Sequence, residues 1–289
     1  MNIDYLKNKI KEEYNDDIGI VIDKRFVTIR VNTLINNIEN VIKVFNDNNI
    51  LYEHVAYYDD ALVVLNKSEE DISNLDIYIN GSIYLQSLSS MMPPLYLDVK
   101  AHEMILDMCA APGSKTSQIA ALSNNNALIT ACERNKGRLE RLKYNLNHLG
   151  VTCVNVMNID SRDLSDDFKF DKIMLDAPCS GSGTLTLKNL DSFKLDDSLL
   201  NKITNTQFTL LNKAINLVNK DSYIIYSTCS ILKEENEDII NKALKTGKVS
   251  LVKLTGKDIE YLNSNIDGVL TIKPSNYYEG FFIALLKKN

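Results

Sequence analysis

The segment Asp107-Met-Cys-Ala-Ala-Pro-Gly-Ser-Lys-Thr116 follows a short apolar run that begins at Met104, and most of its side chains are small. Such a segment is typical of a tight turn that leads from a buried strand into a helix. From about residue 101 onward, apolar runs of strand length alternate with stretches that have helical spacing. This alternation favours a mostly parallel sheet with helices on both faces. The sequence therefore predicts an α/β fold of the doubly wound kind.

The elements of this larger domain can be assigned from hydrophobic periodicity. Strands are expected at Met104–Cys109, Ala127–Glu133, Thr152–Met157, Asp171–Asp176, Tyr223–Thr228 and Gly280–Leu286. Helices are expected at about 115–122, 135–148, 198–218 and 233–245. Open α/β sheets place their chemistry at the carboxyl ends of the strands. The side chains that follow these strands are therefore the candidates for function.

The first hundred residues follow a different pattern. Residues 1–75 predict a small α/β domain, and residues 76–100 predict a segment that bridges to the larger domain at 101–289. Gly81 and the break at Met92-Pro-Pro94 are the signals for that bridge. Helices are expected at Leu6–Tyr14 and about 34–45, and strands at Arg25–Val31, Ala61–Leu65 and Ile77–Ile79.

Composition and charge exclude several broad classes of protein. The 289 residues are 45% hydrophobic and 24% charged, which is ordinary for a globular protein. No apolar run approaches the roughly 20 residues of a membrane-spanning helix. The start of the chain lacks the pattern of a signal peptide, so we expect no membrane association and a cytoplasmic location. The net charge of −6 does not itself indicate nucleic-acid binding, although a local basic face is compatible with it.

Cysteine and histidine usage predicts neither a disulfide framework nor a metal site. The five cysteines include no Cys-x-x-Cys pair, and His54, His102 and His148 are scattered along the sequence. Cys132 and Cys153 are interpreted as small core residues.

The turn after the first strand of the larger domain is the first candidate binding site. Its small side chains would let a ligand approach the backbone amides at the start of the following helix. The segment lacks the Gly-x-Gly-x-x-Gly pattern of dehydrogenases and the Gly-x-x-x-x-Gly-Lys-Ser/Thr pattern of kinases and ATPases. Both enzyme classes are therefore disfavoured. A tight turn without a ligand is the alternative.

Two acidic side chains follow the next two strands. Glu133 lies where a doubly wound fold binds ribose hydroxyls, although an ordinary acidic residue at a helix start is the alternative. Asp160 is placed to accept a hydrogen bond from an exocyclic amine such as adenine N6, and a solvated loop is its alternative. Together the two carboxylates predict an adenosine ligand. Without a phosphate-binding loop, the candidate for that ligand is S-adenosylmethionine.

Two cysteines follow two further strands. Cys179 lies in Asp176-Ala-Pro-Cys-Ser-Gly-Ser-Gly183, and Cys229 closes the run that begins at Tyr223. Carbon 5 of cytosine is too weak a nucleophile to take a methyl group directly, and a thiolate that adds to carbon 6 activates it. The carbon-5 proton and the first thiol must then leave, which a second thiol can assist. Asp176 is placed to hydrogen-bond the amine and N3 edge of the cytosine.

These motifs together resemble the Sun/Nop-type RNA cytosine-5 methyltransferases. The resemblance rests on Asp107–Thr116, on Asp176–Thr184 and on Tyr226-Ser-Thr-Cys-Ser230, which is followed by Glu234-Glu-Asn-Glu237. Outlying segments agree as well, namely Arg30-Val-Asn-Thr-Leu34, Tyr84-Leu-Gln-Ser-Leu-Ser-Ser90 and Glu279-Gly-Phe-Phe-Ile-Ala284. The similarity runs from about residue 28 to the C-terminus.

The resemblance implies a class I S-adenosylmethionine-dependent methyltransferase with a small N-terminal, RNA-recognition-like domain that binds RNA. It implies methylation of carbon 5 of a cytosine in tRNA or rRNA by a monomer without a metal. It assigns Cys229 as the nucleophile and Cys179 as the release-assisting group, an order that spacing does not give. The implied cofactor site contains Cys109, Ala110, Ala111, Pro112, Gly113, Ser114, Lys115, Glu133, Asp160 and Asp176, with Lys115 also near the target base and Asp176 also catalytic.

Some positions depart from the family pattern. Ser114 replaces a usual glycine, and Thr186-Leu-Lys-Asn-Leu-Asp191 stands where the family carries arginines and a proline, which implies fewer phosphate contacts.

Two other functions are the alternatives. An amino-directed adenine methyltransferase would carry Asp/Asn-Pro-Pro-aromatic in place of Asp176–Cys179. A non-catalytic RNA-binding or ribosome-assembly factor of the same fold is the other alternative, although both cysteines are retained. The compact architecture favours tRNA over rRNA.

Overall fold

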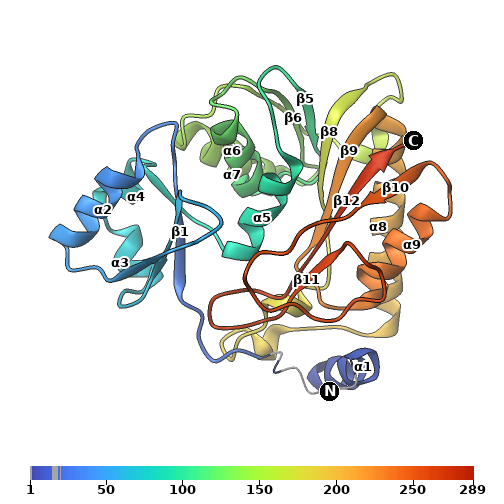
Figure 1. Ribbon diagram of the computed structural model, residues 1–289, viewed down its shortest axis with the longest axis horizontal. Helices are drawn as coiled ribbons and strands as arrows, with labels where there is room; N and C mark the ends of the chain where they lie inside the picture. Colours follow the sequence, from blue (N-terminus) through green and yellow to red (C-terminus); the bar gives the residue numbers. More distant parts are fainter. Residues whose placement is uncertain (1, 15–18, 20) are drawn as a thin grey trace.

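A large mixed sheet forms the centre of the protein, whose computed structural model describes residues 2–14, 19 and 21–289 (Figure 1). Its strands are ordered β10-β12-β9-β8-β5-β6-β7, and β11 also pairs with β12. The strands are β5 (Met104–Asp107), β6 (Leu128–Cys132), β7 (Val154–Met157), β8 (Phe170–Asp176), β9 (Val218–Thr228), β10 (Val249–Val252), β11 (Leu270–Ile272) and β12 (Phe281–Lys288).

The direction of the strands creates a place for a ligand. Parallel pairing joins β5 to β6 and β8, β6 to β7, and β8 to β9. Only towards the β10 side does the pairing become antiparallel, between β9 and β12 and between β12 and β10. The chain moves outward from β5 to β7 and returns to β8 on the other side of β5. Loops that leave such a switch point separate and open a crevice. The predicted doubly wound, mostly parallel sheet is confirmed.

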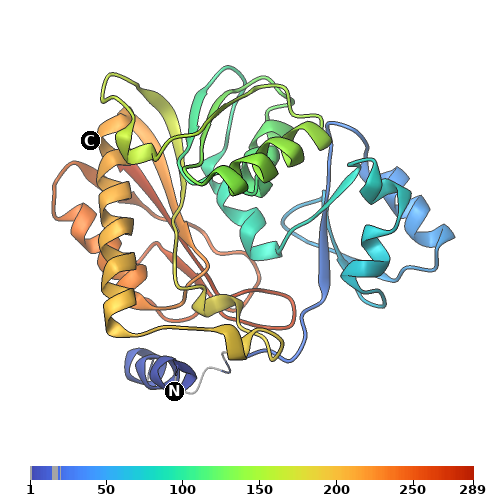
Figure 2. The same cartoon turned by 180° about the vertical axis from the view of Figure 1, so that it is seen from behind.

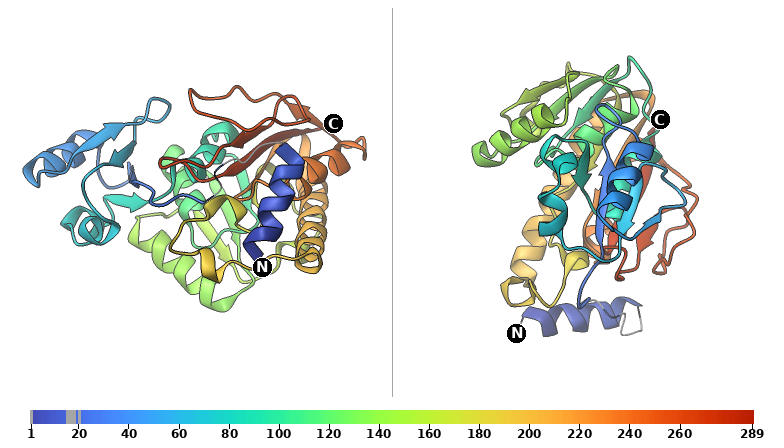
Figure 3. Two further views of the ribbon diagram at one scale, coloured as in Figure 1. Left: turned by 90° about the horizontal axis from the view of Figure 1, so that it is seen from below. Right: turned by 90° about the vertical axis from the view of Figure 1, so that its left-hand side faces the viewer.

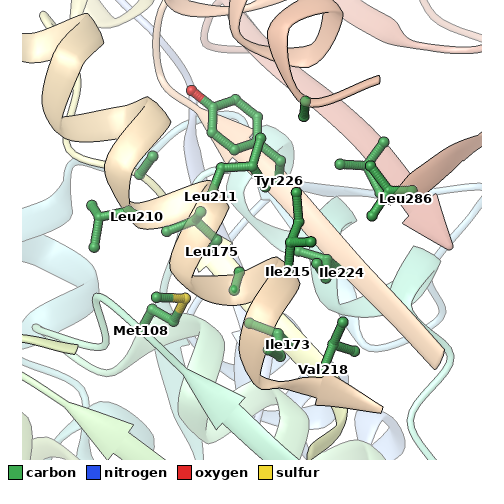
Figure 4. Close-up of a cluster of buried hydrophobic side chains, with 14 of the residues drawn as sticks. Met108, Ile173, Leu175, Leu210, Leu211, Ile215, Val218, Ile224, Tyr226 and Leu286 are labelled. Carbon is green, nitrogen blue, oxygen red and sulfur yellow. The ribbon is translucent and has the colours of Figure 1, made fainter. Parts of the chain in front are cut away.

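Helices cover both faces of the large sheet (Figures 1 and 2). They are α5 (Leu88–Leu97), α6 (Ser114–Leu122), α7 (Lys136–His148), α8 (Asp197–Leu217) and α9 (Glu237–Leu244). On one face Leu211 and Ile215 of α8 pack with Leu175 of β8 and Tyr226 of β9 (Figure 4). Each fully buried side chain of this size contributes about 1.5–3 kcal/mol. The same packing fixes where β8 and β9 end.

A small antiparallel sheet lies beside the large one. Its order is β2-β3-β1-β4, formed by β1 (Val27–Val31), β2 (Tyr52–His54), β3 (Ala61–Val64) and β4 (Ile83–Leu85). With α2 (Ile38–Asp47), α3 (Glu69–Ser73) and α4 (Asp76–Ile79), the chain order is β-α-β-β-α-β, which is the ferredoxin-like arrangement. Phe45 and Ile72 are fully buried in the core between these helices and the sheet.

One expectation for residues 76–100 was wrong. The predicted strand Ile77–Ile79 is helix α4, in which Ile77 is buried and Ile79 is 60% exposed. Three residues are too few for periodicity to distinguish a strand from one helical turn. The predicted bridge contains β4, which pairs with β1, and α5, which continues through Pro93 and Pro94. Buried contacts of α5 with the large sheet override the break that the prolines suggested.

Helix α1 (Asn2–Tyr14) packs on the large part of the molecule, not in the small domain predicted at 1–75 (Figures 1 and 3). Leu6 and Ile10 are buried in a cluster that includes Ile231. The Tyr14 hydroxyl donates a hydrogen bond to the Ile231 carbonyl over 2.7 Å. The apolar face of α1 therefore covers the chain just after Cys229.

A buried arginine joins the small sheet to the large one. Arg30 in β1 is fully buried, and its Nε donates to Gln86 Oε1 over 2.9 Å. Its Nη2 donates to Ser117 Oγ over 2.8 Å, and Ser117 belongs to α6. The small sheet is thus attached to the helix that starts at the turn 107–116. In the described part of the chain, no helix is both long and apolar enough to cross a membrane.

Candidate active site

A cavity of about 250 Å³ opens at the carboxyl edge of the large sheet. Its walls come from the residues that end or follow β5 to β9, with one side chain of α7 and two of α8. The lining residues are Met108, Cys109, Ala111, Cys132, Glu133, Arg134, Arg138, Ile159, Asp160, Ser161, Arg162, Asp176, Ala177, Pro178, Cys179, Thr206, Leu210 and Cys229. The cavity therefore lies at the edge where the sequence predicted the chemistry.

Cys179 and Cys229 meet in the wall of this cavity. Cys179 lies three residues after β8, and Cys229 directly follows β9, the parallel neighbour of β8. Their Sγ atoms are 2.9 Å apart, at hydrogen-bonding distance, and both side chains are partly buried. Gly183 N donates to the Cys229 carbonyl over 3.0 Å, which joins the two loops directly. Strand pairing thus brings together two thiols that are far apart in the sequence.

The surroundings of Cys179 favour its protonated form. The hydrogen bond with Cys229, together with burial, raises the pKa of the Cys179 thiol well above its usual range. Cys179 therefore keeps its proton at neutral pH. Either sulfur atom can be the donor in the contact between the two thiols.

Asp176 and Lys115 form a buried pair next to the thiols. Lys115 Nζ donates to Asp176 Oδ2 over 2.7 Å and to Ser90 Oγ over 2.9 Å. Ser227 Oγ donates to Asp176 Oδ1 over 2.7 Å. The Lys115 side chain is 8% exposed, whereas that of Asp176 is 32% exposed. Lys115 and Ser227 therefore orient the Asp176 carboxylate, part of which remains exposed to the cavity.

The turn 109–113 is braced by the helices on either side. Gly113 has a φ of +107°, a conformation that side chains rarely adopt, and a Cβ there would lie 3.0 Å from Leu142 Cδ1. Arg138 Nη2 donates to the Ala111 carbonyl over 2.7 Å. Thr116 Oγ1 donates to Asp107 Oδ2 over 2.7 Å. Burial raises the pKa of Asp107 to about 6.

Glu133 and Asp160 both line the cavity, but their carboxylates are not equally free. Glu133 Oε1 accepts from Asn135 N over 2.7 Å, and Oε2 lies 3.6 Å from Arg138 Nη1. Both oxygens of Asp160 accept hydrogen bonds from Arg162, at 2.9 and 2.6 Å. These bonds lower the pKa of Asp160 to about 2. Glu133 is therefore the more available acceptor, because Asp160 is already held by an arginine.

The predicted cofactor residues occupy different places around the cavity. Cys109, Ala111, Glu133, Asp160 and Asp176 line it. Within the described structure, the lining does not include Ala110, Pro112, Gly113, Ser114 and Lys115. Lys115 reaches the cavity through Asp176. The assignment of the whole set as a cofactor site stays a prediction.

Of the two cysteines interpreted as core residues, Cys132 is one, whereas Cys153 is only partly buried. All five are free thiols, and Cys132 is fully buried. Burial raises the pKa of Cys132 to about 12. Cys153 packs against the core on the α5 and α6 face. Among the described residues, no group of three or more His, Cys, Asp and Glu side chains is placed to hold a metal ion.

Sequence reasoning missed several side chains that organise the site. Ser90 and Ser227 fix the Lys115–Asp176 pair, and Arg138 braces the turn. Glu235 is fully buried behind the two thiol loops. A signal was present for Glu235, because Glu234-Glu-Asn-Glu237 lies between the apolar pairs Ile231-Leu232 and Ile239-Ile240.

Comparison with known proteins identifies the family. The family described as 16S rRNA methyltransferase RsmB/F matches residues 94–287, well over half of the chain. The chain belongs to the RsmB/F family. The Sun/Nop-type resemblance seen in the sequence is thereby confirmed.

Individual relatives agree with the RsmB/F assignment. The chain is 34% identical over 280 residues to the 28S rRNA (cytosine-C(5))-methyltransferase of Mus musculus, covering 91% of this chain and 35% of that protein. It is 33% identical over 281 residues to ribosomal RNA small subunit methyltransferase F of Shewanella halifaxensis, covering 91% and 58%. A methyltransferase homolog protein from Pyrococcus horikoshii is similar in structure, with a TM-score of 0.82 and 30% identity, covering 97% of this chain and 90% of that one.

These comparisons confirm the class I methyltransferase fold. They also show that the chain spans only 35% and 58% of the length of the two curated relatives. The shared region includes the large sheet and its cavity, since the family match begins within α5 and ends within β12.

Proposed function

We propose that this protein is an RNA cytosine-C5 methyltransferase that uses S-adenosylmethionine. The observation that carries the proposal is the pair of Cys179 and Cys229 thiols, 2.9 Å apart in the wall of a cavity that Glu133 also lines. Membership of the RsmB/F family supports it, as do relatives named as cytosine-C5 methyltransferases.

The cavity suits S-adenosylmethionine as a ligand. Glu133 offers a carboxylate oxygen to ribose hydroxyls, because Oε2 is engaged only at 3.6 Å by Arg138. Cys109 and Ala111 present a wall of small side chains. Asp160 would contact the adenine amine only in exchange for part of its bonding to Arg162. When bound, the cofactor supplies an electrophilic methyl group on a positively charged sulfur.

The protein's own residues account for the remaining steps. Cys229 Sγ adds to carbon 6 of the cytosine, and the electron density gained at carbon 5 lets that carbon take the methyl group. The Asp176 carboxylate accepts a hydrogen bond from the cytosine amine, in an orientation set by Lys115 and Ser227. Solvent water then takes the carbon-5 proton, the electron pair of that C–H bond restores the 5,6 double bond, and the C6–S bond breaks so that Cys229 departs as a thiolate. Cys179 assists this release from its place beside Cys229.

The proposed substrate is ribosomal RNA. Relatives from mouse and from Shewanella are named for rRNA, which outweighs the weak preference for tRNA drawn from the compact architecture. The small sheet is the proposed RNA-contacting domain, and the enzyme is proposed to act as a monomer.

Bisulfite sequencing of total RNA tests this proposal directly. Cells that lack the protein should lose 5-methylcytosine at one or more rRNA positions, and the purified protein should restore it with S-adenosylmethionine. Loss confined to tRNA would redirect the substrate assignment. No loss in any RNA, together with no methyl transfer in vitro, would contradict the enzymatic function.

A further inference from the structure

We propose that Glu235 is a positioning residue that fixes the Cys179 and Cys229 thiols relative to each other. Glu235 ends the short helix η4 (Lys233–Glu235) and its side chain is fully buried. Within the described structure it is not part of the cavity lining, so it acts through other residues. A buried carboxylate is costly unless it receives hydrogen bonds, and its donors therefore show what it organises.

The donors to Glu235 come from the residues next to each cysteine. Ser180, which directly follows Cys179, donates its backbone N–H to Oε1 over 2.8 Å and its hydroxyl to Oε2 over 2.5 Å. Ser230, which directly follows Cys229, donates its hydroxyl to the same Oε2 over 2.5 Å. One carboxylate thus ties together the two chain segments that carry the thiols.

Further contacts fix Glu235 and the first loop from outside. Gln207 Nε2 in α8 donates to Glu235 Oε1 over 3.2 Å and to the Pro178 carbonyl over 3.0 Å. The Tyr226 hydroxyl donates to the Glu235 backbone carbonyl over 2.7 Å. The carboxylate is therefore anchored to α8 and the backbone of Glu235 to β9, in addition to the loops that the carboxylate joins.

The next residue fixes the second loop. Asn236 Nδ2 donates to the Ser230 carbonyl over 2.9 Å, and Thr228 Oγ1 donates to Asn236 Oδ1 over 2.5 Å. Thr228 and Ser230 flank Cys229, so Glu235 and Asn236 constrain both sides of that residue. The Glu-Asn pair is a rigid support directly behind the thiols.

This support explains how two thiols can be kept at 2.9 Å without being joined. Loss of the carboxylate would leave Ser180 N without its acceptor. It would also remove the side-chain link between the two loops next to the thiols, while the Gly183–Cys229 backbone hydrogen bond remains. A shift of about 1 Å in a reacting group typically lowers a rate by about 10²-fold. The kinetic part of the proposal rests on the proposed function, in which Cys229 attacks and Cys179 assists release.

A reagent that reacts with two neighbouring thiols tests the positioning role without RNA. Phenylarsine oxide forms two As–S bonds with two neighbouring thiols and releases one water. Peptide mapping of the wild type should show the reagent bridging Cys179 and Cys229. We expect E235A to lower this bridging about tenfold or more and E235Q to lower it less, because an amide keeps one acceptor oxygen. D238N, which removes an exposed acid from the adjacent helix α9, is the matched control and should behave as wild type.

The positioning role can be tested even if E235A does not fold. In that case S180A and S230A, which keep Glu235, are measured instead and should each lower bridging. Wild-type bridging in folded E235A, or in both serine variants, would overturn the proposal.

A kinetic measurement then separates the two loops. In a C179A background, S230A should slow formation of the covalent protein–RNA conjugate about tenfold, because it loosens the attacking thiol. With Cys179 present, S180A should instead slow the release of the RNA from Cys229, so that the conjugate accumulates. Equal effects of both serine variants on both steps would contradict separate positioning of the two thiols. Reduced bridging without any conjugate in any variant would uphold the role of Glu235 and refute the proposed function.

Discussion

Lys115 Nζ lies 2.7 Å from Asp176 Oδ2, while the Ser227 hydroxyl donates to the other oxygen of the same carboxylate. These two contacts come from α6 and β9, which belong to opposite sides of the switch point. Asp176 is therefore oriented by the fold before any substrate binds. A preoriented charge stabilises a transition state without reorganisation at the moment of reaction.

Replacing Asp176 with asparagine should expose this role. D176N keeps the shape but removes the charge paired with Lys115, so we expect turnover to fall by about 10²-fold or more with the fold intact. Single-turnover methyl transfer measures the effect, and the melting temperature checks the fold. Activity within a few-fold of wild type would reduce Asp176 to a structural turn residue.

The cofactor assignment predicts a specific loss of affinity. E133A removes a carboxylate that lines the cavity, and we expect S-adenosylmethionine binding to weaken by roughly 1–3 kcal/mol. Calorimetry on the purified protein measures the change. E140A, which removes a 70% exposed acid from the same region of the chain, is the control and should bind normally. Equal affinities for E133A and wild type would place the ribose elsewhere.

Asp107 should make stability depend on pH. Burial raises its pKa to about 6, above the value near 3.8 expected for the unfolded chain. The folded state therefore binds this proton more tightly. The stabilisation is fully present below about pH 4 and is lost as the pH rises through about 6.

D107N isolates this contribution because it cannot titrate. Between pH 4 and pH 7, the free energy of unfolding of the wild type should fall by up to about 3 kcal/mol relative to that of D107N. Urea unfolding of both proteins at several pH values gives this difference. A difference that stays constant across the range would show that Asp107 has the same pKa in both states.

Much of the site could be predicted because it depends on where buried strands end. The apolar runs of β8 and β9 place Cys179 and Cys229 at one edge, and the run of β6 places Glu133 there as well. Such runs are decided by burial, which sequence periodicity reports well. The alternation of strand and helix predicted a mostly parallel sheet, whereas the order of the strands, which makes these ends neighbours, comes from the structure.

The parts that could not be predicted depend on contacts between distant segments. Leu6 and Ile10 mark an amphipathic helix, but nothing local shows that their partner is Ile231. Glu235 is flanked by apolar pairs, but nothing local shows that Ser180 and Ser230 supply the hydrogen bonds that let its carboxylate be buried. Long-range hydrogen bonding of a buried charge leaves no periodic signal in the sequence.

The two thiols lie 2.9 Å apart but are proposed to act at different steps, and their removal should stall the reaction at different species. C229A lacks the attacking sulfur and should give neither a covalent adduct nor a product. C179A should still attack and methylate but release poorly, and it should accumulate a protein–RNA conjugate.

Denaturing electrophoresis after incubation of each variant with substrate RNA and S-adenosylmethionine distinguishes the two roles. We expect a shifted protein–RNA band with C179A and none with C229A. A conjugate with C229A and none with C179A would contradict this assignment.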